Sequence, residues 1–100
     1  MDRQEAARLL RRELTAYARR SREDLIGLIG QVEAYSIDGP TGVAYQVEVD
    51  AHWEGGFGGT IRVLGSIDDG GFRTSFSPTT DGFLMDTDGV VEMAEPGARD

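Results

Sequence analysis

The sequence predicts an α+β fold, in which an N-terminal helix and a short second helix pack on one face of an antiparallel meander sheet of four to five strands. Apolar residues recur at helical spacing over residues 1–30 and alternate with polar residues over residues 31–93. Short turn sequences separate the alternating segments. We therefore expect one α+β domain over residues 1–93 and a flexible tail over residues 94–100.

The first helix is predicted over residues 3–19, within the helical segment 1–20. Asp2 and Glu5 have the spacing of a capping box. The apolar residues that follow at helical spacing are Ala6, Leu10, Leu14, Tyr17 and Ala18. Ser21 is a preferred N-cap residue, so we predict a second, short helix within residues 21–30 that ends at a glycine.

The sheet begins where the apolar period changes from 3.6 to 2. Residues 43–54 alternate strictly between apolar and polar types, which predicts a half-buried strand with one wet face. Residues 61–68 and 72–76 repeat the pattern, and Tyr35 and Ile37 mark a shorter first strand. These four strands form a meander in chain order.

The register follows from facing and turn chemistry together, because residues directly opposite in an antiparallel pair share a face. The expected opposite pairs are Tyr35 with Tyr45, Trp53 with Ile61, and Ile67 with Phe72. The first pairing places residues 39–41 at the tip of its hairpin, and the second leaves residues 56–58 as a three-residue loop. The third leaves Asp69-Gly70 as a two-residue loop, the sequence that a type I′ turn prefers.

The C-terminal part has a weaker signal. We expect a loop over residues 77–82, then two short edge strands at 83–85 and 90–91 around a turn at 86–89. The helices are the only elements available to cover the inward face of the sheet. The expected core positions of that face are Tyr45, Val47, Val49, Trp53, Ile61, Val63, Phe72 and Phe76.

The charges are segregated along a chain whose net charge is −8. Residues 1–22 hold seven arginines against three acids, a net of +4, and residues 23–100 hold three arginines against fifteen acids, a net of −12. All ten basic residues are arginines, as a GC-rich bacterial genome would produce. Without cysteine or lysine, the chain has no thiolate chemistry and no Schiff-base lysine.

The chain begins without a signal-peptide pattern and contains no apolar run of membrane-spanning length, so we expect a cytoplasmic protein with no membrane partner.

His52 is the sole histidine, and it shares a strand face with Asp50 while Arg62 is expected opposite. Asp50 would suit the orientation of a histidine general base. The alternative is a surface histidine on a strand of alternating charge. Ser66 is expected opposite Glu48 rather than beside His52, so a Ser-His-Asp triad is not predicted.

Two acidic turns, at residues 68–71 and 86–89, resemble pieces of calcium loops. Neither has the spaced acids, central glycine and terminal glutamate of a complete loop. Asp-Gly is also a preferred hairpin sequence. We therefore expect turns, with no metal site and no cofactor.

The glycine-rich segment 55–59 joins two strands and opens no helix, so it lacks the geometry that cradles phosphate. Phe57 at its tip either anchors a partner or folds back onto the core end beside Trp53. The arginine-rich first helix also has two interpretations. Its arginines, among them Arg8, Arg12 and Arg19, either pair with acids of this domain or a second copy, or they bind nucleic acid.

Two sequence runs resemble those of a family of short uncharacterised bacterial proteins. They are GPTG followed by YQVEV at residues 39–49, and RVLGSIDDGGFR at residues 62–73. The family pattern is GPxG followed by YQVEV, then RVxGSIDDGGxR, and the resemblance spans about residues 21–92. It implies a bacterial origin and a stand-alone small fold. The family has no established activity, so it implies no site residue.

Three hypotheses follow for function. In the first, the chain is a non-enzymatic interaction module that self-associates or offers a basic protein an acidic sheet face with an apolar contact at Phe57. The acidic residues of that face are Glu48, Asp50, Glu54 and Asp68. The second is a small ligand-binding or enzymatic domain that uses a polar set on the sheet, namely Asp50, His52, Arg62 and Arg73. The third, nucleic-acid binding through the first helix, is the least favoured because the domain is acidic.

Overall fold

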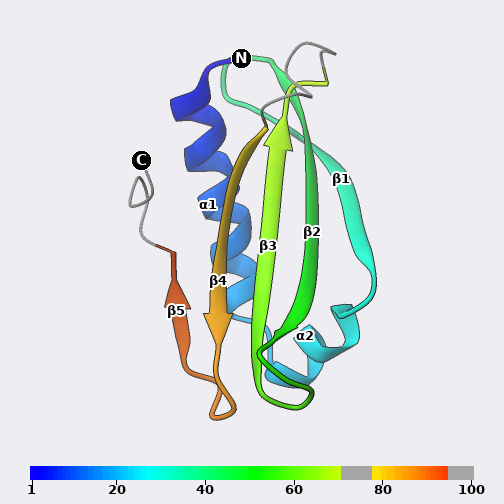
Figure 1. Cartoon of the computed structure of the whole chain (residues 1–100). Helices are drawn as coiled ribbons and strands as arrows, with labels where there is room; N and C mark the ends of the chain where they lie inside the picture. The colour runs from blue at the N-terminus through cyan, green and yellow to red at the C-terminus, as the bar shows by residue number, and fades with distance from the viewer. Residues whose placement is uncertain (71–77, 95–100) are drawn as a thin grey trace.

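The computed structural model describes residues 1–70 and 78–94, which form two helices and one antiparallel sheet of five strands (Figure 1). The helices are α1 (Arg3–Ala18) and α2 (Arg22–Leu28). The strands are β1 (Val32–Asp38), β2 (Ala44–Glu54), β3 (Thr60–Asp68), β4 (Thr79–Met85) and β5 (Val91–Met93). They lie in the order β1-β2-β3-β4-β5, so the sheet is a meander. The predicted α+β fold is confirmed.

Helix α1 begins at the predicted cap, because Asp2 Oδ1 accepts a hydrogen bond from the Glu5 backbone N–H at 3.0 Å. The helix lies on one face of the sheet and packs mainly on β4 and β3 (Figure 1). Leu10 and Leu14 pass directly over Gly65, where an added Cβ would stand 3.1 Å from a methyl group of each. The glycine therefore lets the helix approach the strand closely.

Helix α2 also confirms its prediction. The Ser21 hydroxyl accepts from the Asp24 N–H at 3.0 Å, and Gly30, with φ of 86°, follows the end of the helix. Leu25 and Leu28 are buried against the β2 side of the same face. No helix in the described ranges is long and apolar enough to cross a membrane.

The register of the central pair is as predicted, with Trp53 opposite Ile61. The register of β1 with β2 is wrong by two residues, because Ile37 rather than Tyr35 lies opposite Tyr45. The loop closes later than expected, with the Gly39 N–H donating to the Val43 carbonyl at 2.7 Å. A shift of two residues leaves every side chain on its predicted face, so facing alone could not exclude it.

The predicted tight turn after β3 is wrong. A type I′ turn needs positive φ at both central residues, and of Asp69 and Gly70 only the glycine has it, at 80°. The Gly70 N–H instead donates to Asp68 Oδ1 at 2.8 Å. The predicted strand at residues 72–76 lies outside the described residues.

Strand β4 occupies the edge of β3 that the predicted 72–76 strand was to pair with. Ile67 lies opposite Thr79, and Val63 lies opposite Phe83. The predicted loop 77–82 is therefore wrong from Thr79 onward. The apolar alternation is hidden there because the inward position between Thr79 and Phe83 carries Asp81, which pairs with an arginine of α1.

The turn at residues 86–89 is confirmed, with the Asp86 N–H donating to the Val90 carbonyl at 2.9 Å. The last strand extends to Met93 rather than ending at residue 91. Of the predicted core, Tyr45, Val47, Val49, Ile61 and Val63 are buried. Trp53 is half-buried, Phe72 and Phe76 lie outside the described residues, and Phe83 and Met85 of β4 join the core instead.

Candidate interaction surface

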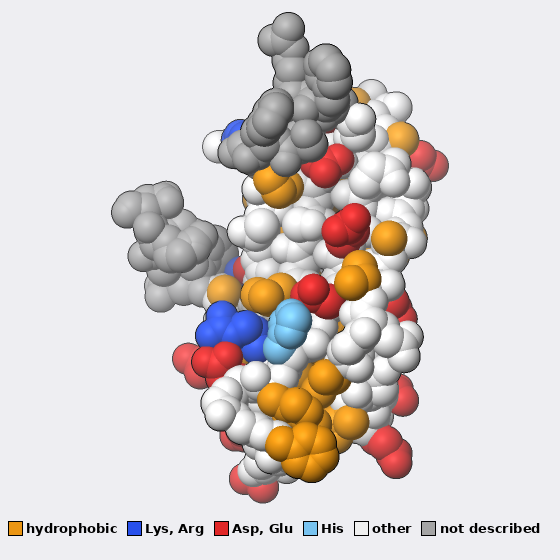
Figure 2. All heavy atoms as spheres, turned by 45° about the vertical axis from the view of Figure 1, so that its right-hand side comes forward, with side chains coloured by type: hydrophobic (Ala, Val, Ile, Leu, Met, Phe, Trp, Pro, Cys, Tyr) orange, Lys and Arg blue, Asp and Glu red, His pale blue; other side chains and the backbone are white. Residues whose placement is uncertain are grey.

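The face of the sheet opposite the helices, called here the outer face, is covered by no described helix or strand. Every second residue of each strand points to it, and Figure 2 shows acidic side chains spread over it. Its described carboxylates are Asp38, Glu48, Asp50, Glu54, Asp68 and Glu92. Arg62 is the one arginine there among residues 1–70 and 78–94. The outer face is therefore strongly negative.

The structure places His52 in the middle of the outer face, opposite Arg62 as predicted. Its Nε2 atom lies 3.5 Å from Asp50 Oδ1, and its side chain is 57% exposed. Arg62 forms a two-pronged ion pair with Glu54, with Nε–Oε1 at 2.6 Å and Nη2–Oε2 at 2.9 Å. These hydrogen bonds lower the pKa of Glu54 and raise the pKa of Arg62.

A shallow depression lies beside these residues on the outer face. It is lined by Val32, Glu48, Asp50, Leu64, Gly65, Ser66 and Thr80. His52 and Arg62 do not line it, and Arg73 lies outside the described residues. The predicted set for ligand chemistry is thus not gathered around this depression. Its two carboxylates stand beside exposed Val32 and Leu64, a combination that suits the aliphatic stem and cationic head of an arginine or lysine.

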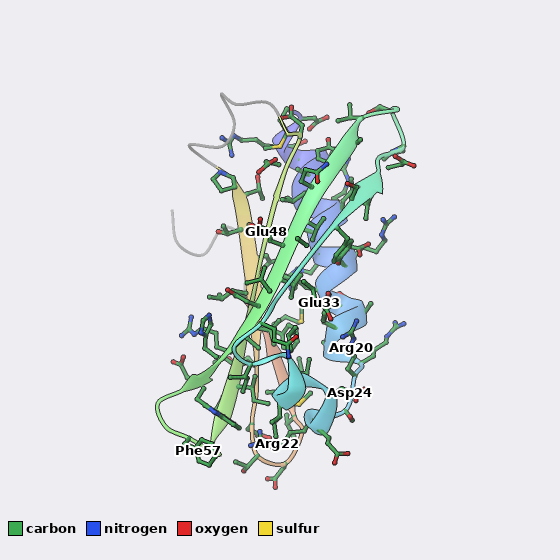
Figure 3. The ribbon with its side chains drawn as sticks, turned by 90° about the vertical axis from the view of Figure 1, so that its right-hand side faces the viewer. Arg20, Arg22, Asp24, Glu33, Glu48 and Phe57 are labelled. Carbon is green, nitrogen blue, oxygen red and sulfur yellow. The ribbon has the colours of Figure 1, made fainter. Side chains whose placement is uncertain are left out.

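The aromatic end, defined as Trp53, Phe57 and Arg22, lies at the β2–β3 hairpin. Figure 3 shows Phe57 and Arg22 at this end of the molecule. Phe57 meets Trp53 edge to face, with ring centroids 5.3 Å apart, yet the side chain is 92% exposed. Of the two interpretations of Phe57, the exposed contact position fits this geometry and a core cap does not. A solvent-exposed aromatic beside an arginine has the composition of an interface anchor.

Arg22, which sequence reasoning did not single out, holds this end together. Its Nη2 atom donates to the Gly58 and Gly59 carbonyls at 2.9 and 2.7 Å, and its Nη1 donates to the Asp86 carbonyl at 3.2 Å. Its guanidinium also lies 5.8 Å from the Trp53 ring centroid. One side chain from the start of α2 therefore joins two hairpins.

Arg11 and Arg12 of α1 form ion pairs within the chain, and Arg11 is not among the arginines singled out from the sequence. Arg11 pairs with Asp81 at 2.9 Å and donates to the Ala94 carbonyl at 2.6 Å. Of the three that were singled out, Arg12 pairs with its neighbour Glu13 at 3.3 Å. The side chains of Arg8 and Arg19 form no ion pair or hydrogen bond within residues 1–70 and 78–94.

A polar cluster joins α1 to the edge strand β1 on the helix-covered face. The Tyr17 hydroxyl donates to Glu33 Oε1, and the Tyr35 hydroxyl donates to Glu13 Oε1 at 3.0 Å. Arg20 adds a contact of 3.9 Å to Glu33, and the two residues lie beside each other in Figure 3. Burial, followed by the hydrogen bonds to carboxylates, raises the pKa of Tyr17 and raises that of Tyr35 to about 12.

No protein-family model, curated protein or solved structure matches this chain. Within the described part of the chain, no group of three or more histidine or carboxylate side chains is placed to hold a metal ion. The fold and surface define a two-layer α+β domain with an uncovered acidic sheet face and an exposed aromatic end.

Proposed function

We propose that this protein is a non-enzymatic interaction module that binds a basic segment of another protein on its outer sheet face. The observation that carries the proposal is that two carboxylates, Glu48 and Asp50, line the same depression as the exposed side chains of Val32 and Leu64. The carboxylates would receive arginine or lysine head groups, and the two apolar side chains would contact their methylene stems.

The charge distribution supports a basic partner. Like-signed carboxylates on one face attract a cationic protein over a distance comparable to the Debye length, which is about 8 Å at physiological salt. Such attraction increases the association rate and decreases with salt. Phe57, at the aromatic end, would supply the apolar contact that a purely electrostatic surface lacks.

The competing functions receive less support from the geometry. His52 is solvated and does not line the depression that its neighbour Asp50 lines, which favours a binding role over a catalytic one. The net charge of −8 opposes nucleic-acid binding, and Arg11, Arg20 and Arg22 are engaged within the chain. The cytoplasmic setting and bacterial origin expected from the sequence remain part of this proposal.

The test compares two double variants that remove the same charge. Glu48→Gln/Asp50→Asn neutralises the depression, and Glu23→Gln/Asp24→Asn neutralises two exposed acids of α2. Figure 3 labels Glu48 and Asp24, one residue of each pair. Each is immobilised beside the wild-type chain, and host proteins are captured at low salt, identified and then titrated individually. The expected result is a basic partner that the outer-face variant binds about tenfold more weakly, since two exposed ion pairs are lost.

The α2 variant is the control for net charge, and it should retain the wild-type affinity for the same partner. Binding should also weaken steadily as salt rises. The proposal is overturned if no basic protein is captured at low salt, or if both variants lose affinity equally.

A further inference from the structure

Among the described residues, strand β1 forms one edge of the sheet and pairs on one side only, with β2. It is seven residues long, and Val32 is 60% exposed. The other edge, β5, has three residues, and the carbonyl of the next residue, Ala94, accepts a hydrogen bond from Arg11. Short edge strands are one way in which proteins avoid edge-to-edge pairing. Of the two edges, β1 is the longer template for another strand.

The outward-facing backbone groups of β1 can be assigned from its hairpin. The Gly39 N–H donates to the Val43 carbonyl at 2.7 Å, which marks this as a hydrogen-bonded pair. Hydrogen-bonded pairs alternate along an antiparallel ladder, so the odd-numbered residues of β1 bond to β2. The residues whose N–H and C=O groups point away from β2 are Val32, Ala34, Ser36 and Asp38.

The open edge has only one of the usual devices against pairing, the inward-facing charge of Glu33. Proteins protect exposed edges with proline, lysine, bulges or inward-pointing charges. Strand β1 has no proline or lysine, and its register with β2 is continuous. The Glu33 carboxylate is directed toward α1, where it accepts from Tyr17 and lies 3.9 Å from Arg20. The negative charge of Glu33 is therefore partly compensated within the chain, and it does not point toward a strand that would pair with β1.

We propose that β1 is a self-association site, where a second copy of this chain adds its own β1 antiparallel about a two-fold axis. In the register that we assign, Tyr35 lies opposite Tyr35 of the second copy. Val32 then lies opposite Asp38, and Ala34 lies opposite Ser36. This pairs every outward-facing residue of β1 with another outward-facing residue, so each can exchange both backbone hydrogen bonds.

The side chains are compatible with this register. Glu33 lies opposite Ile37 and Asp38 lies opposite Val32, so no carboxylate directly faces another. The two Tyr35 residues form a non-hydrogen-bonded pair, in which the backbones approach most closely. The two half-buried rings then lie together on the helix-covered face, where each copy already anchors its own tyrosine hydroxyl through Glu13. The two sheets become one continuous sheet.

A chain without cysteine permits a direct test of this register by a single introduced thiol. In Tyr35→Cys, the two Cα atoms of the pair would stand about 4.5 Å apart, within the range of a disulfide. In the control Ile37→Cys, the two thiol-bearing residues would be about 13 Å apart, beyond that range. The expected result is a covalent dimer of the first variant under mild oxidation and little or none of the second.

A second pair of variants tests the same register at exposed positions, without reliance on the half-buried tyrosine. Ala34→Glu/Ser36→Arg places opposite charges across the interface twice, and Ala34→Glu/Ser36→Glu places like charges there. Sedimentation equilibrium over protein concentrations from about 1 μM to 1 mM should show a dissociation constant at least about tenfold lower for the first variant. Wild type should dimerise more tightly as salt rises, because two chains of net charge −8 repel each other.

The proposal is overturned if wild type sediments as a monomer at the highest concentration, if the two cysteine variants cross-link equally, or if the two charge variants have the same dissociation constant. These outcomes leave the outer-face function untouched. Binding of a basic partner weakens with salt and depends on Glu48 and Asp50, while β1 pairing strengthens with salt and depends on Ala34 and Ser36.

Discussion

The two faces of the sheet are built from the same strands, yet they have opposite physical character. On the helix-covered face, Val47, Val49 and Val63 are fully or almost fully buried under α1 and α2. On the outer face, the residues between them include Glu48, Asp50 and Leu64, which remain in contact with solvent. Because successive side chains of a strand point to opposite faces, each core residue is next in sequence to a residue of the surface that we propose for binding.

Charge is divided between the same two sides. The basic residues of the N-terminal segment lie in the helical layer, and the outer face carries six of the described carboxylates. Arg11 of α1 pairs with Asp81 on the helix-covered face of β4, so part of the basic charge stabilises the fold. The acids of the outer face have few such partners, and Arg62 with Glu54 is the chief exception. Stability and binding therefore depend on different faces, and mutations should separate them.

The largest expected difference comes from truncation of one leucine on each side. Leu14 is fully buried between α1 and Gly65, and Leu64 on the outer face is 39% exposed. Leu14→Ala should lower the free energy of unfolding by about 2–5 kcal/mol, because it leaves a cavity under the helix. Leu64→Ala should lower it by less than about 1 kcal/mol.

Urea unfolding of both leucine variants, followed by circular dichroism, measures the comparison. The slope of free energy against urea concentration should stay that of wild type, so that the midpoints report stability. If both variants lost the same free energy of unfolding, Leu64 would be as buried as Leu14, and the outer face would not be exposed to solvent.

The next largest expected effect is a loss of stability at alkaline pH, which arises only from tyrosines on the helix-covered side. All three tyrosines have a raised pKa, that of Tyr35 to about 12, chiefly because of burial. In the unfolded chain they ionise near pH 10, so between pH 10 and 12 the folded state holds more protons. Stability should therefore fall as pH rises through this window. The chain has no lysine or cysteine to confuse the measurement.

Tyr35→Phe should make the alkaline fall shallower, because it removes one group whose pKa differs between the two states. Urea midpoints at intervals from pH 9 to 12 measure the slope, and absorbance of tyrosinate follows the ionisation. Ionisation of all three tyrosines near pH 10 in the folded protein would contradict the burial of their hydroxyl groups.

Much of the fold was predictable, because local patterns carry it. The capping residues Asp2 and Ser21 fixed the two helix starts, and alternation assigned the correct face to β2 and β3. The pairing of β1 was predicted on the correct face but two residues out of register, since facing repeats every two residues and loop length is a weak constraint.

The part that could not be predicted depends on contacts between distant segments. Strand β4 was hidden because Asp81 takes an inward position, and its partner Arg11 lies 70 residues away. Asp69-Gly70 has the sequence that a type I′ turn prefers, which is why a tight hairpin was predicted there. In the structure, β3 pairs with β4, which begins at Thr79. In the candidate site, the outer-face acids followed from alternation. The three-carbonyl contact of Arg22 had no sequence signal beyond its place beside the cap Ser21.

The smallest expected effect is on the outer face itself, at the exposed pair of Arg62 and Glu54. Hydrogen bonding from Arg62 lowers the pKa of Glu54, so the pair contributes stability above the unfolded pKa of the carboxyl and loses it as pH falls. Arg62→Gln should return the pKa of Glu54 toward its ordinary value, measured by NMR titration of the side-chain carboxyl carbon. Thermal unfolding near neutral pH should barely change, because both side chains are largely solvated.

Arg8→Gln is the matched control, since it removes the same charge from the opposite side of the molecule and should leave Glu54 unchanged. An unmoved Glu54 titration in Arg62→Gln would show that the ion pair is not formed in solution. If the pair is formed, its loss frees a carboxylate on the outer face. Arg62→Gln should then bind the basic partner of our proposal more tightly than Arg8→Gln does, while both keep the wild-type stability. Binding would thus respond to a charge on the outer face that the fold does not need.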